Sequence, residues 1–113
     1  MTPRRRRWFL SIFAATLTVL AASGSAAQTP DGKLVFETHC QKCHGPAGRP
    51  SAGIKKLLPE IPLWDAAFFA KRTEEDILNV LRNGKGKNMK PFSDRLKPEE
   101  MVAVARYIRT LTP

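Results

Sequence analysis

Two cysteines and a histidine stand close together in the sequence Cys40-Gln41-Lys42-Cys43-His44, and the chain has no other cysteine. This C-x-x-C-H spacing is typical of the covalent attachment of a c-type haem. The two thiols can add to the two vinyl groups of a porphyrin, and the adjacent imidazole of His44 can then bind the iron. The motif therefore predicts one covalent haem c, with Cys40 and Cys43 as attachment sites and His44 as proximal iron ligand.

Two other kinds of site also use paired cysteines. A redox-active C-x-x-C pair normally opens a helix in a βαβ unit, whereas this pair follows a predicted helix and no strand pattern is visible. A zinc site needs four ligands, and the chain's two histidines, His39 and His44, each adjoin one of the cysteines. Haem attachment is the interpretation that fits both the motif and its context.

The second axial ligand of the iron is expected to come from a distant side chain. Beyond Met1 the chain has two methionines, Met89 and Met101. Met101 falls on the apolar stripe of a predicted helix, which is typical of a core residue. Met89 lies in a Gly- and Lys-rich loop, over residues 84–92, with no apolar stripe to join. The sequence therefore favours Met89 as the sixth ligand, the alternative being a loop methionine packed against the surface.

The segments that must position these residues show helical periodicity, with apolar residues recurring at spacings of three and four. Thr29-Pro30-Asp31 predicts the start of a helix that leads to the motif. A second helix is expected from Thr73, an N-cap residue followed by three acidic residues, to Asn83-Gly84. Pro98 begins the last helix, and a shorter one is expected over 65–71. The last helix is expected to bury Met101, Val104, Ala105, Ile108 and Leu111.

No segment alternates with period two, so the expected fold class is all-α, with about three to five helices wrapped around one covalently bound haem. The segment 45–64 is rich in Gly and Pro and is expected to have little regular structure. Such a long loop is reasonable in a small domain if it wraps a large group. The apolar side chains expected to pack there are Leu57, Leu58, Trp64, Phe68, Phe69, Leu81, Phe92 and Ile108.

Residues 1–27 have the layout of a secretory signal peptide. Arg4–Arg7 form a positive segment, residues 8–22 carry no charge, and Ser25 and Ala27 supply the small residues of a cleavage site. The apolar run is shorter than the roughly 20 residues of a membrane-spanning helix, although an uncleaved anchor is the alternative. We therefore expect a cleaved signal over 1–27, a domain over 28–113 and a periplasmic location.

The formal net charge of +9 invites a nucleic-acid-binding interpretation. Four of the basic residues, Arg4–Arg7, belong to the predicted signal, however, so the expected mature domain is less basic. No recognition motif appears, and the aromatic residues do not interleave with a basic stripe. The composition therefore does not favour a nucleic-acid partner.

Over about residues 30–112 the chain resembles the class I mono-haem cytochromes c. In that family a first helix carrying a glycine and an aromatic residue leads into C-x-x-C-H. An axial methionine lies near a proline and an aromatic residue, and an aromatic residue of the last helix crosses the first helix. The residues that match these three features are Gly32 and Phe36, then Met89 with Pro91 and Phe92, then Tyr107.

Two features of the sequence bear on that comparison. The family often has Met followed directly by Pro, whereas Lys90 intervenes between Met89 and Pro91. The family also uses a proline carbonyl in the loop after the motif to accept the Nδ1–H of the proximal histidine. Pro59 and Pro62 are both candidates for that role.

The resemblance implies the small cytochrome c fold and an electron carrier rather than an enzyme, with His44 and Met89 filling both axial positions of the iron. Two alternatives stay open: a haem-bearing subunit or domain of a dehydrogenase or oxidase complex, and a haem sensor or enzyme with an open sixth site. The family attaches haem after translocation, which favours the general secretory route even though Arg6-Arg7-Trp8-Phe9-Leu10 resembles part of a twin-arginine signal.

Three lysines, Lys85, Lys87 and Lys90, surround Met89 in the sequence. They either solvate the loop or steer a redox protein that has an acidic docking surface. Redox proteins of that kind are the expected partners, and no integral membrane segment is expected if the signal is cleaved.

Overall fold

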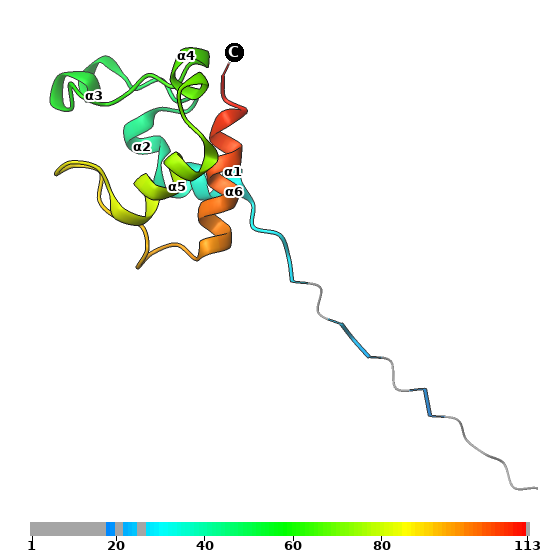
Figure 1. Ribbon diagram of the computed structural model, residues 1–113. Helices are drawn as coiled ribbons and strands as arrows, with labels where there is room; N and C mark the ends of the chain where they lie inside the picture. The colour runs from blue at the N-terminus through cyan, green and yellow to red at the C-terminus, as the bar shows by residue number, and fades with distance from the viewer. Residues whose placement is uncertain (1–17, 20–21, 25–26, 113) are drawn as a thin grey trace, which may run out of the picture.

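The computed structural model describes residues 18–19, 22–24 and 27–112 (Figure 1). The basic segment Arg4–Arg7 and most of the predicted signal peptide lie outside the described residues. Among the helices of the described part, none is long and apolar enough to cross a membrane.

The described residues form an all-helical domain. Its helices, in chain order, are α1 (Gly32–His39), α2 (Gln41–His44), α3 (Ala52–Leu57), α4 (Ala66–Ala70), α5 (Glu74–Asn83) and α6 (Pro98–Arg109). The only β pairing within the described ranges is an isolated bridge between Lys85 and Met89. The expected all-α class is therefore confirmed.

The helix count exceeds the expected three to five for two local reasons. Helix α2 is a single turn that follows α1 after Cys40 alone. Helix α3 lies inside the segment 45–64, where little regular structure was expected. It forms because the Ser51 hydroxyl accepts a hydrogen bond from Ile54 N at 3.3 Å and so caps the first turn.

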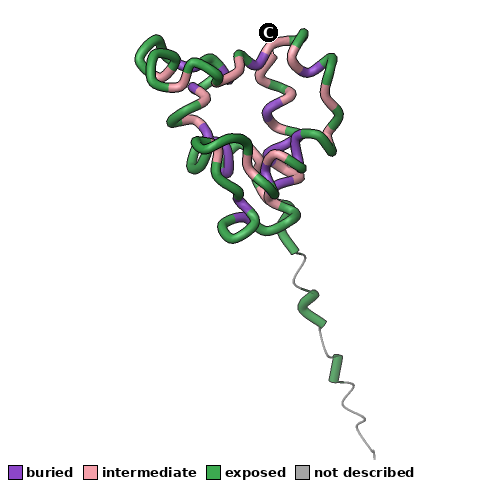
Figure 2. Tube along the Cα trace, turned by 60° about the vertical axis from the view of Figure 1, so that its left-hand side comes forward, coloured by how far each residue is buried: buried purple, intermediate pink, exposed green. Residues whose placement is uncertain are grey.

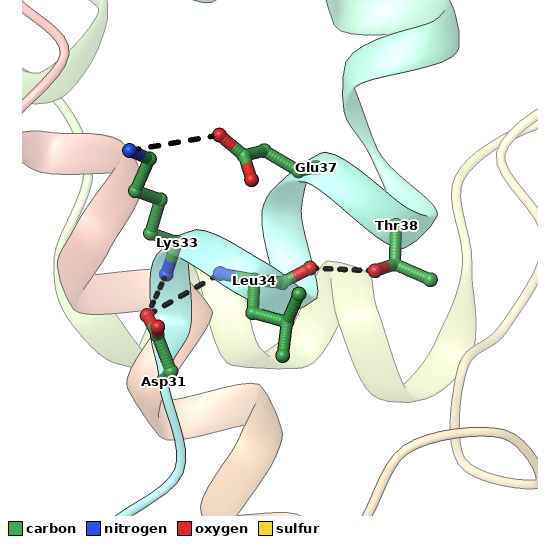
Figure 3. Close-up of polar contacts among 5 residues, drawn as sticks. All are labelled: Asp31, Lys33, Leu34, Glu37 and Thr38. Carbon is green, nitrogen blue, oxygen red and sulfur yellow. Dashed lines mark hydrogen bonds and ion pairs between the residues drawn. The ribbon is translucent and has the colours of Figure 1, made fainter.

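The start of α1 is set by Asp31, whose carboxylate accepts hydrogen bonds from Lys33 N at 2.9 Å and Leu34 N at 3.3 Å (Figure 3). These bonds satisfy backbone donors that have no partner inside the helix. The start predicted at Thr29-Pro30-Asp31 is therefore shifted slightly, because Pro30 precedes the N-cap residue instead of opening the first turn.

Helices α1 and α6 cross at close range, near the centre of Figure 1. A Cβ atom at Gly32 would collide with the backbone carbonyl of Ala103 in α6. The rings of Phe36 and Tyr107 pack at the same crossing, with centroids 5.5 Å apart. The predicted contact of Tyr107 with the first helix is confirmed, and the crossing fixes the helix that leads into the C-x-x-C-H motif.

Side-chain hydrogen bonds close the first turns of α5 and α6. The Thr73 hydroxyl accepts from Asp76 N at 3.1 Å, and the Asp76 carboxylate accepts from Thr73 N at 2.7 Å, which completes a capping box. Pro98 is the first residue of α6, as predicted, and the Glu100 carboxylate accepts from Lys97 N at 2.8 Å.

The core lies where the inner faces of these helices meet, and buried and exposed stretches alternate along the chain in Figure 2. In α6, Met101, Val104, Ala105 and Ile108 are buried as predicted, whereas Leu111 is half-buried. The prediction that Leu57 packs in the apolar interior is wrong, because this residue is 76% exposed at the end of α3. Leu58, the next residue, is half-buried instead.

Candidate haem site

The C-x-x-C-H motif occupies the junction of α1 and α2. Cys40 ends α1, its N–H donating to Phe36 O at 2.9 Å, and His44 N donates to Cys40 O at 3.0 Å in the next turn. One turn of helix therefore holds Cys40, Cys43 and His44 together. The Cys40 side chain is buried, the Cys43 side chain is exposed, and both thiols are free.

All four sequence-predicted site residues line one cavity of about 990 Å³. This volume is at the upper end of the range for pockets that hold small molecules and cofactors. Its walls come from the motif, the segment 58–64, α5, the loop 84–92 and α6. The predicted ligands on its surface are Cys40, Cys43, His44 and Met89, and its apolar lining includes Leu58, Ile61, Trp64, Phe68, Ile77, Leu81, Phe92, Val104 and Ile108.

The imidazole of His44 is oriented by stacking. Its ring lies 4.3 Å from that of Trp64, with 17° between the two planes. Burial lowers the pKa of His44 to about 4, so the ring is neutral at physiological pH. A neutral imidazole is the form that binds a metal ion.

The buried Nδ1 atom of His44 has no hydrogen-bond partner. Neither candidate proline, Pro59 nor Pro62, accepts its hydrogen, although Pro62 lines the cavity. The hydrogen bond that the family resemblance implies between His44 Nδ1 and a proline carbonyl is therefore not formed in this structure. An imidazole in an apolar cavity beside two free thiols fits an iron porphyrin attached through C-x-x-C-H.

The thiol of Cys40 differs from a reactive redox cysteine. Burial raises its pKa to about 11, and the positive charge of Arg95 offsets only part of this effect. The thiol is therefore protonated near pH 7, whereas redox-active cysteines are thiolates in electropositive surroundings. The site is thus unlike a dithiol oxidoreductase centre.

Met89 reaches the cavity from a tight loop between α5 and α6. The loop is closed by a hydrogen bond from Lys85 N to Met89 O at 2.8 Å and begins at Gly84, which has a φ of 74° that favours glycine. The Met89 side chain is half-buried against the core. Met101, by contrast, is buried on α6 and does not line the cavity.

Three contacts at the cavity were not expected from the sequence. Trp64 stacks on His44, the guanidinium of Arg95 lies 4.3 Å from the centre of the Phe92 ring, and Asn88 donates a hydrogen bond to Glu60 at 2.9 Å. The Trp64–His44 and Asn88–Glu60 contacts join separate segments, so no local spacing signals them, whereas Phe92 and Arg95 lie in one turn, where Arg95 N donates to Phe92 O. The presence of one tryptophan in the Gly- and Pro-rich segment 45–64 was the one available sign.

Comparison with known proteins decides the family. A family model described as "Cytochrome C oxidase, cbb3-type, subunit III" matches residues 27–108. The chain belongs to the mono-haem c-type cytochromes. The family resemblance expected from the motif is thereby confirmed, and family membership implies a covalent haem c.

Relatives of this cytochrome include small cytochromes and longer proteins. It is 34% identical over 73% of its length to cytochrome c6 of Anabaena variabilis, covering 90% of that protein. It is 40% identical over 81% of its length to the chloroplastic cytochrome c6 of Chlamydomonas reinhardtii, of which it spans 60%. It is 30% identical over 72% of its length to the cbb3-type cytochrome c oxidase subunit FixP of Sinorhizobium medicae, of which it spans 29%.

A solved structure supports the fold of this cytochrome. The KustC0563 c-type cytochrome superposes with a TM-score of 0.66 at 31% identity, over 74% of this chain and 99% of that one. The expected small cytochrome c fold is therefore confirmed.

Proposed function

We propose that this cytochrome is a periplasmic electron carrier that uses one covalent haem c with His44 and Met89 as axial ligands. The observation that carries the proposal is the single cavity in which the C-x-x-C-H motif and the distant Met89 meet. When bound, the haem supplies an iron that alternates between the ferric and ferrous states.

The residues of the chain have separate tasks in this proposal. Cys40 and Cys43 form the thioethers that prevent loss of the cofactor. His44 offers a neutral imidazole, which Trp64 holds in place by stacking. Met89 offers a soft thioether, which favours the ferrous state more than a second histidine would. If His44 and Met89 both bound the iron, a substrate would have no free position on it, as expected of an electron carrier.

A second candidate is supported by the relatives. The family model is described by an oxidase subunit, and three relatives are named as FixP subunits of cbb3-type cytochrome c oxidases. On this alternative the chain is the haem-bearing subunit or domain of such a complex. The two candidates have the same haem ligands and the same cavity, and they differ in the proteins with which the chain exchanges electrons.

The location and the domain limits are part of the same proposal. We infer that residues 1–27 form a cleaved signal and that residues 28–113 form the cytochrome domain in the periplasm. The proposed partners are redox proteins with acidic surfaces, because Lys85, Lys87 and Lys90 lie exposed around Met89.

Spectroscopy of the purified protein tests the proposal. A pyridine haemochrome assay is expected to give the spectrum of a haem with two thioether bonds. Replacement of either cysteine, in Cys40→Ala or Cys43→Ala, is expected to change that spectrum. The ferric spectrum is expected to show the weak long-wavelength band of Met–iron bonding, which Met89→Ala removes and Met101→Leu keeps. Absence of covalent haem would overturn the proposal, and an unchanged spectrum in Met89→Ala would favour an open or differently filled sixth site.

A further inference from the structure

The loop that carries Met89 is tied to a distant segment by a side-chain hydrogen bond. Asn88 Nδ2 donates to Glu60 Oε1 at 2.9 Å, across 28 positions of sequence. Both residues line the cavity. Glu60 lies in the segment between α3 and Trp64, and Asn88 directly precedes Met89, so the bond joins two walls of the cavity.

The other hydrogen bonds of this loop reach only its own residues or α5. Lys85 N donates to Met89 O at 2.8 Å, and Gly84 N donates to Val80 O at 2.8 Å. Of the hydrogen bonds found among the described residues, the Glu60–Asn88 bond is the one that connects residues 84–90 to a segment other than α5. Without it, residues 84–90 would be held by the bonds to α5, by the buried Phe92 that follows them and by the packing of the Met89 side chain.

Glu60 is suited to accept this bond as a carboxylate. The hydrogen bond from Asn88, a hydrogen bond from the backbone of Glu60 itself and, least, the charge of Lys87 hold the pKa of Glu60 below its usual range. Hydrogen bonds to an ionised acceptor are stronger than those between neutral groups. Because Glu60 and Asn88 are both exposed, solvent weakens the bond, and its effect is expected to be moderate.

We propose that Glu60 is a positioning residue for Met89: by accepting the hydrogen bond from Asn88, it holds the loop 84–90 against the cavity and keeps the Met89 thioether at the iron. The inference rests on the proposed ligation by Met89. A loop with positive φ angles at Gly84 and Gly86 has little regular structure of its own to resist opening. A tie at the residue next to the ligand therefore acts where opening would begin.

Displacement of Met89 by imidazole tests this role in the ferric holoprotein. If the tie holds the loop closed, Glu60→Ala and Asn88→Ala each raise the apparent affinity for imidazole, by roughly two- to fivefold, as expected for the loss of one solvent-exposed polar contact. The double variant should bind imidazole about as tightly as each single variant, because the two substitutions remove the same hydrogen bond. Glu60→Gln keeps an amide oxygen that can accept, although as a neutral acceptor, and should retain part of the wild-type resistance that Glu60→Ala loses.

A matched control is the exposed bond between Arg82 Nη1 and Glu75 Oε1, which is 2.7 Å long and lies on α5. Glu75→Ala removes a comparable surface contact and should leave imidazole affinity unchanged. A second measurement, amide hydrogen exchange of the holoprotein, should show faster exchange at Lys85 in Glu60→Ala, because that N–H closes the loop.

The outcomes separate this inference from the proposed function. If the wild-type protein shows the Met–iron band and Glu60→Ala changes neither imidazole affinity nor exchange at Lys85, the positioning role is wrong and the ligation stands. If Glu60→Gln is as disruptive as Glu60→Ala, the charge rather than the hydrogen bond matters, and the role as stated is wrong. If the wild-type protein lacks the band, ligation by Met89 fails, and the positioning role fails with it.

Discussion

At the residue scale, Arg95 places a positive charge at the cavity. Its guanidinium stacks on the buried Phe92 ring at 4.3 Å and acts electrostatically on Cys40, a predicted attachment site. A fixed positive charge near the haem disfavours the ferric state, which carries one more positive charge than the ferrous state. Arg95 is therefore expected to raise the reduction potential.

Replacement of Arg95 should lower that potential. For Arg95→Met we expect a decrease of roughly 20–60 mV, since an exposed charge is partly screened by solvent. Arg95→Lys keeps the charge and should shift the potential much less. Spectroelectrochemical titration at low ionic strength measures both variants, and equal potentials for wild type and Arg95→Met would contradict the effect.

At the scale of elements, two glycines in helices differ sharply in the space around them. A Cβ atom at Gly32 would meet the Ala103 backbone and the Tyr107 Cβ atom at the α1–α6 crossing. A Cβ atom at Gly53 in α3 would meet only the Ser51 Oγ atom, at 3.9 Å. The same substitution should therefore have opposite effects at the two positions.

Gly32→Ala is expected to destabilise the domain by about 1–3 kcal/mol, because the backbone at the crossing cannot yield to an added methyl group. Gly53→Ala is expected to stabilise it by up to about 1 kcal/mol, through the helix propensity of alanine. Denaturant unfolding of the two holoproteins measures both changes. Stabilisation by Gly32→Ala would show that α1 and α6 are less closely packed than described.

The capping box of α5 provides a pH-dependent contribution to stability. Hydrogen bonds from the Thr73 N–H and hydroxyl lower the pKa of Asp76. A carboxyl whose folded pKa is depressed stabilises the fold above its unfolded pKa, and this stabilisation is lost as the pH falls through the folded pKa. The contribution of Asp76 is thus complete at neutral pH and disappears in acid, below its ordinary pKa of 3.8.

Two variants of the capping box check this dependence. Thr73→Ala should cost about 1 kcal/mol at pH 7. Asp76→Asn should be less stable than wild type at pH 7 but approach it as the pH falls below 4. Unfolding free energies of wild type and variants at several pH values give the comparison, and a difference that persists unchanged in acid would mean that the Asp76 charge is not responsible.

At the scale of the whole molecule, the positive charges around the cavity are expected to act together. Lys85 and Lys90 line the cavity and Lys87 lies between them, all exposed. Such a cluster attracts an acidic partner over distances comparable with the Debye length. The effect belongs to the association rate more than to the lifetime of the complex.

Association with an acidic redox protein should therefore slow as ionic strength rises. Removing the three charges, in Lys85→Ala, Lys87→Ala and Lys90→Ala combined, should lower the rate constant roughly tenfold at low salt and little at high salt. Lys33, which pairs with Glu37 on α1, is the control, and Lys33→Ala should barely change the salt dependence. Stopped-flow kinetics of electron transfer measure these rate constants. A wild-type rate constant that does not change with ionic strength would contradict electrostatic steering.

The parts of the fold that could be predicted are those encoded by neighbouring residues. The start of α6 at Pro98, the capping of α5 by Thr73 and the burial of Met101 follow from spacing and side-chain chemistry within one helix. Helix α3 was missed because it has only six residues, includes Gly53 and lies among prolines. The exposure of Leu57 was missed because an apolar residue in a short segment gives no periodicity to orient it.

The residues of the candidate haem site could be identified from the sequence, but the contacts among them could not. The C-x-x-C-H motif and the isolated Met89 identified residues that the fold brings to one cavity. The stacking of Trp64 on His44 and the bond between Glu60 and Asn88 depend on how loops pack across the cavity, which no local pattern encodes. Tertiary contacts between irregular segments are therefore the part that required the structure.

The order of the C-x-x-C-H motif and of α6 along the chain has a consequence for biogenesis. Val104 and Ile108 of α6 form part of the cavity wall, and they are synthesised about 60 residues after Cys40. Cys40, only 8% exposed in the folded domain, therefore emerges long before the wall that helps to enclose it exists. If haem is attached to Cys40 and Cys43, we expect both thiols to be most accessible for that reaction in the interval before α6 docks.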